Sequence, residues 1–424
     1  MLAPTPASPE QAGMSQAALD RLENHLKQRY IDAGRFPGTQ LLIYRRGKVV
    51  HSVSQGFADL ERKVPVKDDT IFRIYSMTKP LTSVAFMMLV EEGRVAIDEP
   101  VHKYIPAWKN LGVFVAGTSP AFLTRPPTRP MLIVDLLRHT SGLTYGFQQR
   151  SNVDAAYREK KIGEVEKAGT LDSMIEDLAK IPLEFSPGEA WNYSVATDVL
   201  GYLVGKISGM PFEQFLKERI FKPLGMNDTD FFVPADKAHR FAACYSADPQ
   251  GGMTFHATER KGTLTLQDDP ATSSFLKPPS LISGGGGLCS TASDYLTFCR
   301  ALLNGGELGG VRLLGPKTLK LMTSNHLPGG LDLPGMSRSL FSEATYNGIG
   351  FGLGFAVTMD PAQTLIAGSP GEFNWGGAAT TSFFIDPAEE MITIFMTQVL
   401  PSSAYPLRRE LRTLVYAAIT ESNL

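Results

Sequence analysis

The sequence predicts an α+β fold, in which one antiparallel sheet built from both ends of the chain is flanked by helices and joined to a mostly helical insertion. Hairpin and strand patterns lie near the two termini, whereas helical periodicity dominates residues 80–280. A sheet buries its apolar face against other elements, so this distribution favours helices packed on the sheet. We therefore expect a discontinuous sheet domain, residues 1–80 and 281–424, a mostly helical domain, residues 81–280, and an active site in the cleft between them.

The terminal elements follow from their residue patterns. Leu19, Leu22 and Leu26 form one apolar stripe, which predicts a helix over residues 15–30. Two strand patterns, 40–44 and 49–53, surround a turn and predict a hairpin. Further expected elements are strands at 351–359, 378–385 and 391–399, a turn at 386–390, a helix at 407–419, and a Pro-rich loop at 120–130.

Composition and charge argue against several classes of function. The 424 residues carry a formal net charge of −2 without a basic cluster, so no nucleic-acid partner is expected. No apolar run approaches the ~20 residues that span a bilayer, so no membrane partner is expected. The three cysteines form no metal-ligand pattern, and neither a metal nor another cofactor is expected. The N-terminus has no signal-peptide pattern, which favours a cytoplasmic location, with a mature secreted form as the alternative.

The candidate nucleophile is Ser76, which begins an S-x-x-K motif that ends at Lys79. Residues three apart share one face of a helix, so the Lys79 amine can reach the Ser76 hydroxyl and activate it. Pro80 is tolerated only in a first helical turn, which places Ser76 at the positive end of the helix dipole. The motif alone is weak, because a second copy runs from Ser274 to Lys277. Two prolines follow that copy, and we expect it to be a chance match.

Two further motifs supply partners for the serine. Tyr193 follows a Pro-Gly turn and precedes a predicted helix, and a phenol beside an ammonium group can lose its proton well below its usual pKa of about 10. The run Trp375-Gly376-Gly377-Ala378 stands at the start of a predicted strand, where adjacent glycines let the backbone pass close to a ligand. The amides of Ala378 and Ser76 are then expected to form an oxyanion hole.

Other catalytic arrangements find less support. The G-x-S-x-G elbow of α/β-hydrolases does not occur in the sequence. A Ser-His-Asp arrangement would use His139 as base, with Asp135 four residues before it on one helix. We expect His139 to be a structural residue whose ring nitrogens are satisfied by hydrogen bonds.

In their order and spacing, Ser76-x-x-Lys79, Tyr193-Ser194-Val195 and Trp375-Gly376-Gly377 resemble the serine β-lactamase/penicillin-binding-protein superfamily. The chain is most similar to class C β-lactamases and family VIII carboxylesterases, and the segments 92–100, 136–143, 221–226 and 284–290 agree with that group. The resemblance implies a β-lactamase/transpeptidase-like fold with Ser76 as the acylated nucleophile and Lys79 as its proton acceptor or relay. It further implies that Tyr193 serves as general base and later activates the deacylating water.

Two departures from the superfamily pattern bear on the substrate. Trp375-Gly376-Gly377 stands where β-lactamases carry K-T-G, and Val195 stands where they carry a polar residue. The loss of a cation that would hold a carboxylate favours a neutral small-molecule ester over an anionic β-lactam. The resemblance thus implies a carboxylesterase for short- to medium-chain esters, with weak β-lactam hydrolysis as a side activity. Alternatives are an acyltransferase with an alcohol acceptor, a β-lactamase or D-amino-acid peptidase, and a non-catalytic relative, which the intact Ser76, Lys79 and Tyr193 disfavour.

Overall fold

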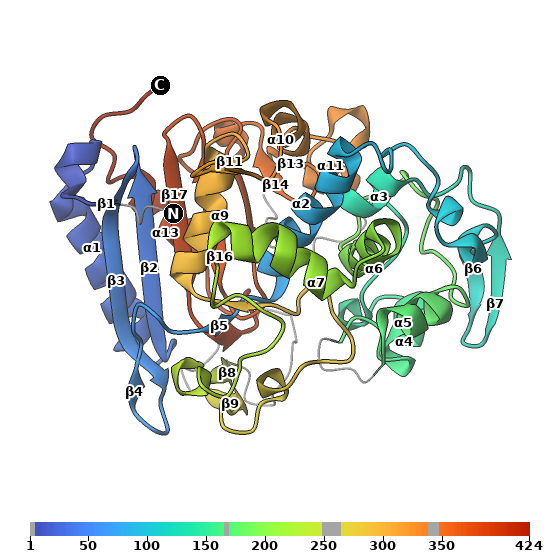
Figure 1. The fold of residues 1–424 in the computed structure, drawn as a ribbon, viewed down its shortest axis with the longest axis horizontal. Coiled ribbons are helices and arrows are strands. Elements are labelled where there is room, and N and C mark those ends of the chain that lie inside the picture. Colours follow the sequence, from blue (N-terminus) through green and yellow to red (C-terminus); the bar gives the residue numbers. More distant parts are fainter. Residues whose placement is uncertain (1–4, 165–168, 248–263, 338–346) are drawn as a thin grey trace.

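A nine-stranded sheet built from both ends of the chain organises the computed structural model, which describes residues 5–164, 169–247, 264–337 and 347–424. The strand order is β1-β3-β2-β17-β16-β15-β14-β13, with β4 paired to β3. Figure 1 shows the blue N-terminal strands beside the red C-terminal ones, which join where β2 pairs with β17. The predicted α+β class is confirmed, and the proposed domain boundaries stay a prediction. The strands are β1 (Thr5–Pro6), β2 (Gly38–Arg45), β3 (Lys48–Asp59), β4 (Val64–Pro65), β13 (Ile349–Phe351), β14 (Ala356–Thr358), β15 (Phe373–Gly376), β16 (Ser382–Asp386) and β17 (Met391–Met396).

Helices cover both faces of this sheet. The terminal helices α1 (Gln16–Leu26) and α13 (Leu407–Tyr416) pack on one face, where the predicted leucines of α1 are buried in one cluster with Leu41, Ile43 and Phe395. On the other face, α2 (Thr78–Glu91) and α9 (Ala292–Leu303) share a large apolar cluster with Ile392 and Ile394. The sheet therefore lies between two helical layers, as the sequence predicted.

The middle of the chain is mainly helical and extends away from the sheet (Figure 1). Its α6 lies against α2, so residues at the start of these two helices come close together. The helices of this part are α3 (Ile133–Leu137), α4 (Asn152–Glu159), α5 (Leu171–Leu178), α6 (Ala196–Ser208), α7 (Phe212–Leu216) and α8 (Lys222–Leu224). Smaller sheets are also present. Among them are two strand pairs, β5 (Phe72–Arg73) with β10 (Cys289–Ser290) and β6 (Val113–Thr118) with β7 (Ala121–Arg125). Another has three strands, β18 (Val399–Leu400), β8 (Cys244–Ser246) and β9 (Thr265–Asp268).

Several expected elements differ from the structure. The stretch 351–359 is not one strand, because it holds the last residue of β13, a turn at which Gly354 adopts a φ of +99°, and then β14. The strand expected at 378–385 begins only at Ser382, and that expected at 391–399 is divided into β17 and β18. The segment 120–130 is not all loop, since it contains β7, and the edge pair β1–β3 is parallel although the sheet was expected to be antiparallel.

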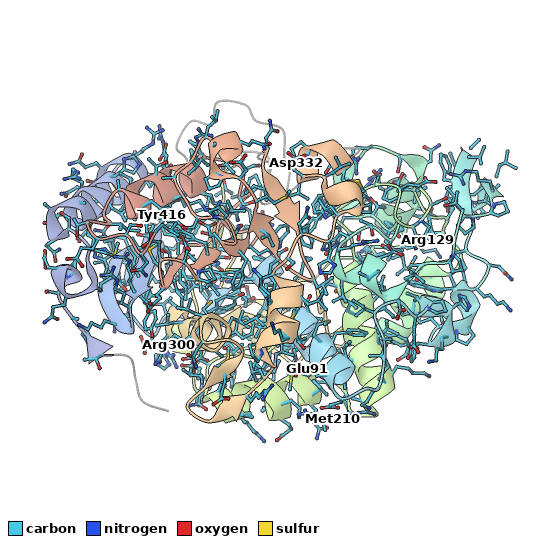
Figure 2. The ribbon with its side chains drawn as sticks, turned by 90° about the horizontal axis from the view of Figure 1, so that it is seen from above. Glu91, Arg129, Met210, Arg300, Asp332 and Tyr416 are labelled. Atoms are coloured by element: carbon cyan, nitrogen blue, oxygen red, sulfur yellow. The ribbon has the colours of Figure 1, made fainter. Side chains whose placement is uncertain are left out.

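The two ends of the molecule are held by buried or partly buried polar contacts. In the view of Figure 2, Tyr416 lies at the sheet end, where its hydroxyl oxygen is 2.6 Å from both Glu372 Oε2 and Asp386 Oδ2, within hydrogen-bonding distance of each. Arg129 lies at the opposite, helical end and binds the buried Asp135 carboxylate at 2.6 Å. None of the helices in the described ranges has both the length and the apolar character needed to cross a membrane.

Candidate active site

Ser76 is presented at the beginning of the helical segment that becomes α2, as the proline at position 80 predicted. It lies in a short 3-10 turn, Tyr75–Met77, which continues directly into α2. The preceding Tyr75 has a φ of +41°, a left-handed conformation that costs a non-glycine residue free energy and often occurs at functional sites. Ser76 is half-buried, whereas Lys79 is only 2% exposed. The serine can therefore meet a ligand while the lysine stays shielded from water.

The Lys79 amine lies within hydrogen-bonding distance of the serine. Its Nζ donates to Ser76 Oγ at 3.2 Å and to the Gly285 carbonyl at 2.6 Å. Burial lowers the pKa of Lys79 to about 7, and the nearby Asp198 carboxylate opposes this by raising it. A substantial fraction of Lys79 is thus neutral near pH 7 and able to accept a proton.

Asp198 is a buried carboxylate that the sequence analysis missed. It lies in α6, and its Oδ1 accepts hydrogen bonds from Ser283 Oγ at 2.6 Å and from the Gly285 amide at 3.0 Å. Gly285 thus contacts Asp198 through its N–H and Lys79 through its C=O. A Cβ at this glycine would lie 2.5 Å from Asp198 Oδ2, so the close packing requires glycine. An aspartate within the apolar run of residues 195–204 was the available signal, because charged residues are rarely buried without a partner.

The Tyr193 hydroxyl is the second group that reaches the serine. It donates to Ser76 Oγ at 2.7 Å, and the side chain is 2% exposed. Its ring packs against Trp375 and His139, with centroid separations of 5.4 and 5.0 Å. Burial raises the pKa of Tyr193 above that of a free phenol, and the bond to Ser76 only partly offsets this. The expected lowering of the Tyr193 pKa was therefore wrong, because the sequence revealed the cation but not the burial.

The Trp375 motif ends a strand, although the sequence predicted that it would start one. Trp375 and Gly376 are the last residues of β15 and pair with Phe383 and Ser382 of β16. The Trp375 side chain is 2% exposed and packs between Tyr193 and Phe351, so it does not present an open aromatic face.

The residues after Trp375 turn beside the nucleophile. A Cβ at Gly377 would lie 2.5 Å from the Ile74 carbonyl, two residues before Ser76. Ala378 packs with Tyr75 against the same small apolar cluster. Within the described part of the chain, the Ala378 amide donates no hydrogen bond, and Ser76 lies in a first helical turn whose amides lack intrahelical acceptors. The structure thus brings Ser76, Lys79, Tyr193 and the motif at 375–378 together.

The Ser-His-Asp arrangement is not formed. His139 lies beyond the end of α3, not on the helix with Asp135, and its Nδ1 is 3.2 Å from Ser194 Oγ. Burial, together with the charge of Lys79, lowers the pKa of His139 well below its usual value, so the ring is neutral. The Asp135 carboxylate binds Arg129 and Thr140. His139 is accordingly a packing residue behind Tyr193.

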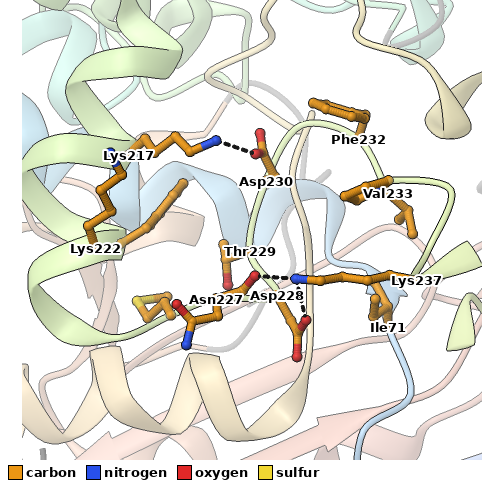
Figure 3. A pocket seen from close by; sticks show the side chains of 13 residues that line it. Ile71, Lys217, Lys222, Asn227, Asp228, Thr229, Asp230, Phe232, Val233 and Lys237 are labelled. Carbon is orange, nitrogen blue, oxygen red and sulfur yellow. Dashed lines mark hydrogen bonds and ion pairs between the residues drawn. The ribbon is translucent and has the colours of Figure 1, made fainter.

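Two other features lie apart from this site. The second S-x-x-K copy forms a short 3-10 turn, and both Ser274 and Lys277 are exposed, as expected of a chance match. A pocket of about 240 Å³ lies beside α7 and the segment 226–237, and Ser76 is not among its lining residues. Figure 3 shows that two of its lysines are paired with acids, with Lys217 bound to Asp230 at 3.5 Å and Lys237 to Asp228 at 2.8 Å.

Replacing Asp198 by asparagine is expected to move the acidic limb of the pH profile of kcat/KM to lower pH. Asparagine keeps an oxygen for the bonds from Ser283 and Gly285 but removes the negative charge that favours the Lys79 ammonium. The pKa of Lys79 then falls, and its neutral form persists at lower pH. The measurement is kcat/KM for p-nitrophenyl butyrate from pH 5 to 9, with the exposed Asp172→Asn as a matched charge control. A limb that stays in place or moves to higher pH would show that Lys79 does not sense Asp198.

The comparisons with known proteins agree with this geometry. A family model described as Beta-lactamase matches residues 19–417. An uncharacterized protein of Mycobacterium tuberculosis (strain CDC 1551 / Oshkosh) is 36% identical over 373 residues, which cover 87% of this chain and 88% of the relative. Esterase EstB of Burkholderia gladioli is 31% identical over 396 residues, 90% of this chain and 91% of the relative. The solved structure of EstCE1, a hydrolase with promiscuous acyltransferase activity, superimposes with a TM-score of 0.76 at 25% identity, covering 96% of this chain and 99% of that one.

Proposed function

The chain belongs to the β-lactamase family of serine hydrolases, and we propose that it is a carboxylesterase that cleaves short- to medium-chain esters through an acyl intermediate on Ser76. The observation that carries the proposal is the convergence of Lys79 Nζ and the Tyr193 hydroxyl on Ser76 Oγ, at 3.2 and 2.7 Å. A relative named as an esterase, 31% identical over most of both chains, supports the choice of ester as substrate. So does the apolar Trp375 in place of the K-T-G cation.

The hydrogen bonds to Ser76 and the pKa shifts of Lys79 and Tyr193 support an order of steps for acylation. Neutral Lys79 accepts the Ser76 proton while Oγ attacks the ester carbonyl carbon. The amides of Ser76 and Ala378 are placed to stabilise the oxyanion that forms. As the C–O bond of the ester breaks, the leaving alkoxide takes the Tyr193 proton, and Lys79 returns a proton to Tyr193.

Deacylation uses the same groups in the reverse sense. Water gives a proton to the Tyr193–Lys79 pair as its oxygen attacks the acyl carbon, and Ser76 leaves with a proton from that pair. The net reaction consumes one ester and one water and releases one acid and one alcohol. Because the proton enters and leaves through these side chains, no cofactor is required in this scheme.

A substrate panel tests the proposal. We expect p-nitrophenyl acetate, butyrate and hexanoate to be hydrolysed with kcat/KM at least ~10²-fold above that for a chromogenic cephalosporin, because a carboxylate without a cation partner binds poorly. Mass spectrometry of the quenched enzyme is expected to place the butyryl group on the peptide that contains Ser76. A cephalosporin hydrolysed faster than every ester would contradict the proposal and favour the β-lactamase alternative.

Acyl transfer is the second candidate, because a solved structure at 25% identity is described as a hydrolase with promiscuous acyltransferase activity. The acyl-Ser76 intermediate can be attacked by an alcohol as well as by water. Adding methanol or butanol at modest concentration to the p-nitrophenyl butyrate assay separates the two outcomes. A predominance of the new ester over butyric acid would assign the chain to the acyltransferases, whereas a predominance of the acid supports an esterase.

We also propose a cytoplasmic location. All three cysteines, Cys244, Cys289 and Cys299, are free and buried, which fits a reducing compartment. Fractionation of the producing cells tests this proposal, and recovery of the protein outside the cytoplasm would contradict it.

A further inference from the structure

Arg408, on the first turn of α13, contacts the turn that follows Trp375. Its Nη2 donates to the carbonyl of Gly377 at 2.9 Å and to that of Thr381 at 3.1 Å. A Cβ at Gly376 would lie 2.4 Å from this nitrogen, so any side chain there would displace the guanidinium. The guanidinium thus leaves no room for a side chain at Gly376, and the nearby Ile74 carbonyl leaves none at Gly377.

The Gly377 carbonyl and the Ala378 amide belong to one peptide group. That carbonyl accepts two hydrogen bonds, from Arg408 and from the Thr380 amide at 3.1 Å, so the plane of the peptide is fixed from two directions. A cation bound to a peptide oxygen draws electron density from the nitrogen and makes the N–H a stronger donor. The N–H of this peptide, on Ala378, donates to no group in the described part of the chain.

We propose that Arg408 is a positioning residue for the oxyanion hole, which orients and polarises the Gly377–Ala378 peptide so that the Ala378 amide stabilises the developing oxyanion. This inference rests on the proposed function and deepens it. The positive charge acts on the reacting carbonyl through a peptide group, not by binding a substrate carboxylate as the K-T-G cation would. Such an arrangement stabilises the oxyanion of a neutral ester and gives no advantage to an anionic substrate.

The electrostatics of the site are compatible with this role. Burial and the neighbouring Arg412 lower the pKa of Arg408 to about 9, so its guanidinium remains charged near neutral pH. Arg408 also lies close enough to Tyr193 for its charge to lower the pKa of that phenol. The cation therefore favours negative charge on both the oxyanion and the phenol oxygen.

The test compares Arg408→Gln with Arg409→Gln, a matched control. The Arg409 guanidinium also donates to a backbone carbonyl, that of Leu365 at 3.2 Å, but outside the site. For p-nitrophenyl butyrate, Arg408→Gln is expected to lower kcat about 10- to 100-fold, less than the loss of a whole oxyanion donor, with KM within about threefold of wild type. Arg408→Lys, which keeps the cation, is expected to recover part of kcat, and Arg409→Gln to retain wild-type values.

The carbonyl stretching frequency of a cinnamoyl-Ser76 acyl-enzyme gives a direct readout, because a polarised carbonyl absorbs at lower wavenumber. Arg408→Gln is expected to shift this band to higher wavenumber, and Arg409→Gln to leave it in place. If Arg408→Gln does not fold, Gly376→Ala replaces it, since the added Cβ displaces the guanidinium while the arginine remains. The same shift is expected from that variant.

The outcomes separate the two proposals. If the wild-type enzyme forms no acyl adduct on Ser76, the proposed function fails. If the wild type is acylated but the Arg408 variant keeps its carbonyl frequency and kcat, the role of Arg408 is overturned. A variant that loses kcat/KM only through a raised KM, with the carbonyl band unmoved and no recovery in Arg408→Lys, would also overturn it, since Arg408 would then serve only the fold.

Discussion

Replacing Ser76 by alanine is expected to lower kcat for p-nitrophenyl butyrate by about 10⁴- to 10⁶-fold, the loss seen when the nucleophile of a serine hydrolase is removed. The substitution deletes one oxygen, on which Lys79 Nζ and the Tyr193 hydroxyl both converge. Without this oxygen no acyl-enzyme can form, and the remaining amides can only stabilise direct attack by water. Initial rates with purified protein and the mass of the quenched enzyme measure the effect.

The second S-x-x-K copy supplies a matched control for this variant. Ser274 is exposed and belongs to a short turn, so Ser274→Ala is expected to retain wild-type activity and stability. Ser76 is half-buried at the surface of the site, and its alanine variant is expected to unfold within a few degrees of the wild-type Tm. A folded Ser76→Ala protein with activity within tenfold of wild type would refute the nucleophile assignment, and with it the acyl-enzyme mechanism.

The parts of the fold that could be predicted are those with a local signal. The helix that carries Leu19, Leu22 and Leu26 and the hairpin 40–53 have clear periodicities of 3.6 and 2, and both are present. The strand β15 was not predicted, because only four residues form it and its buried Asn374 and Trp375 give no alternation. The stretch 351–359 is mostly apolar and resembles one strand, but a Gly-x-Gly within it marked the turn that was missed.

The parts of the site that could be predicted are those held within a motif. Ser76 and Lys79 are three residues apart on a helical segment, so their contact follows from the spacing alone. Tyr193 was a candidate from its Pro-Gly turn and the helix after it, and the resemblance supported its role, but its contact with Ser76 spans 117 positions of sequence and follows from no spacing. Asp198 accepts a hydrogen bond from the Gly285 amide, and Arg408 donates one to the Gly377 carbonyl. A contact between a side chain and a distant backbone group gives no residue spacing that a sequence motif could reveal. Burial, which determines the pKa values of Lys79 and Tyr193, depends on the whole fold and is likewise absent from any motif.

Removing only the hydroxyl of Tyr193 is expected to lower kcat by about 10²- to 10⁴-fold, the usual contribution of a positioned acid or base. The Tyr193→Phe variant keeps the ring that packs against Trp375 and His139, but it lacks the hydroxyl that donates to Ser76 Oγ. Tyr30→Phe is a matched control, because its buried hydroxyl donates to Glu410 at 2.6 Å on the other face of the sheet. Stopped-flow release of p-nitrophenol measures acylation, and the decay of the butyryl mass adduct measures deacylation.

The two rates distinguish the roles of Tyr193. Because burial keeps the phenol protonated, its first action is to donate a proton to the leaving group, and p-nitrophenolate is a good leaving group that needs little help. An alkyl ester such as ethyl butyrate leaves as a basic alkoxide and requires the proton. Tyr193→Phe is therefore expected to slow acylation by the alkyl ester more than acylation by the p-nitrophenyl ester. Equal losses for both esters would contradict the acid role and return Tyr193 to the role of a base acting on Ser76, which the resemblance implied.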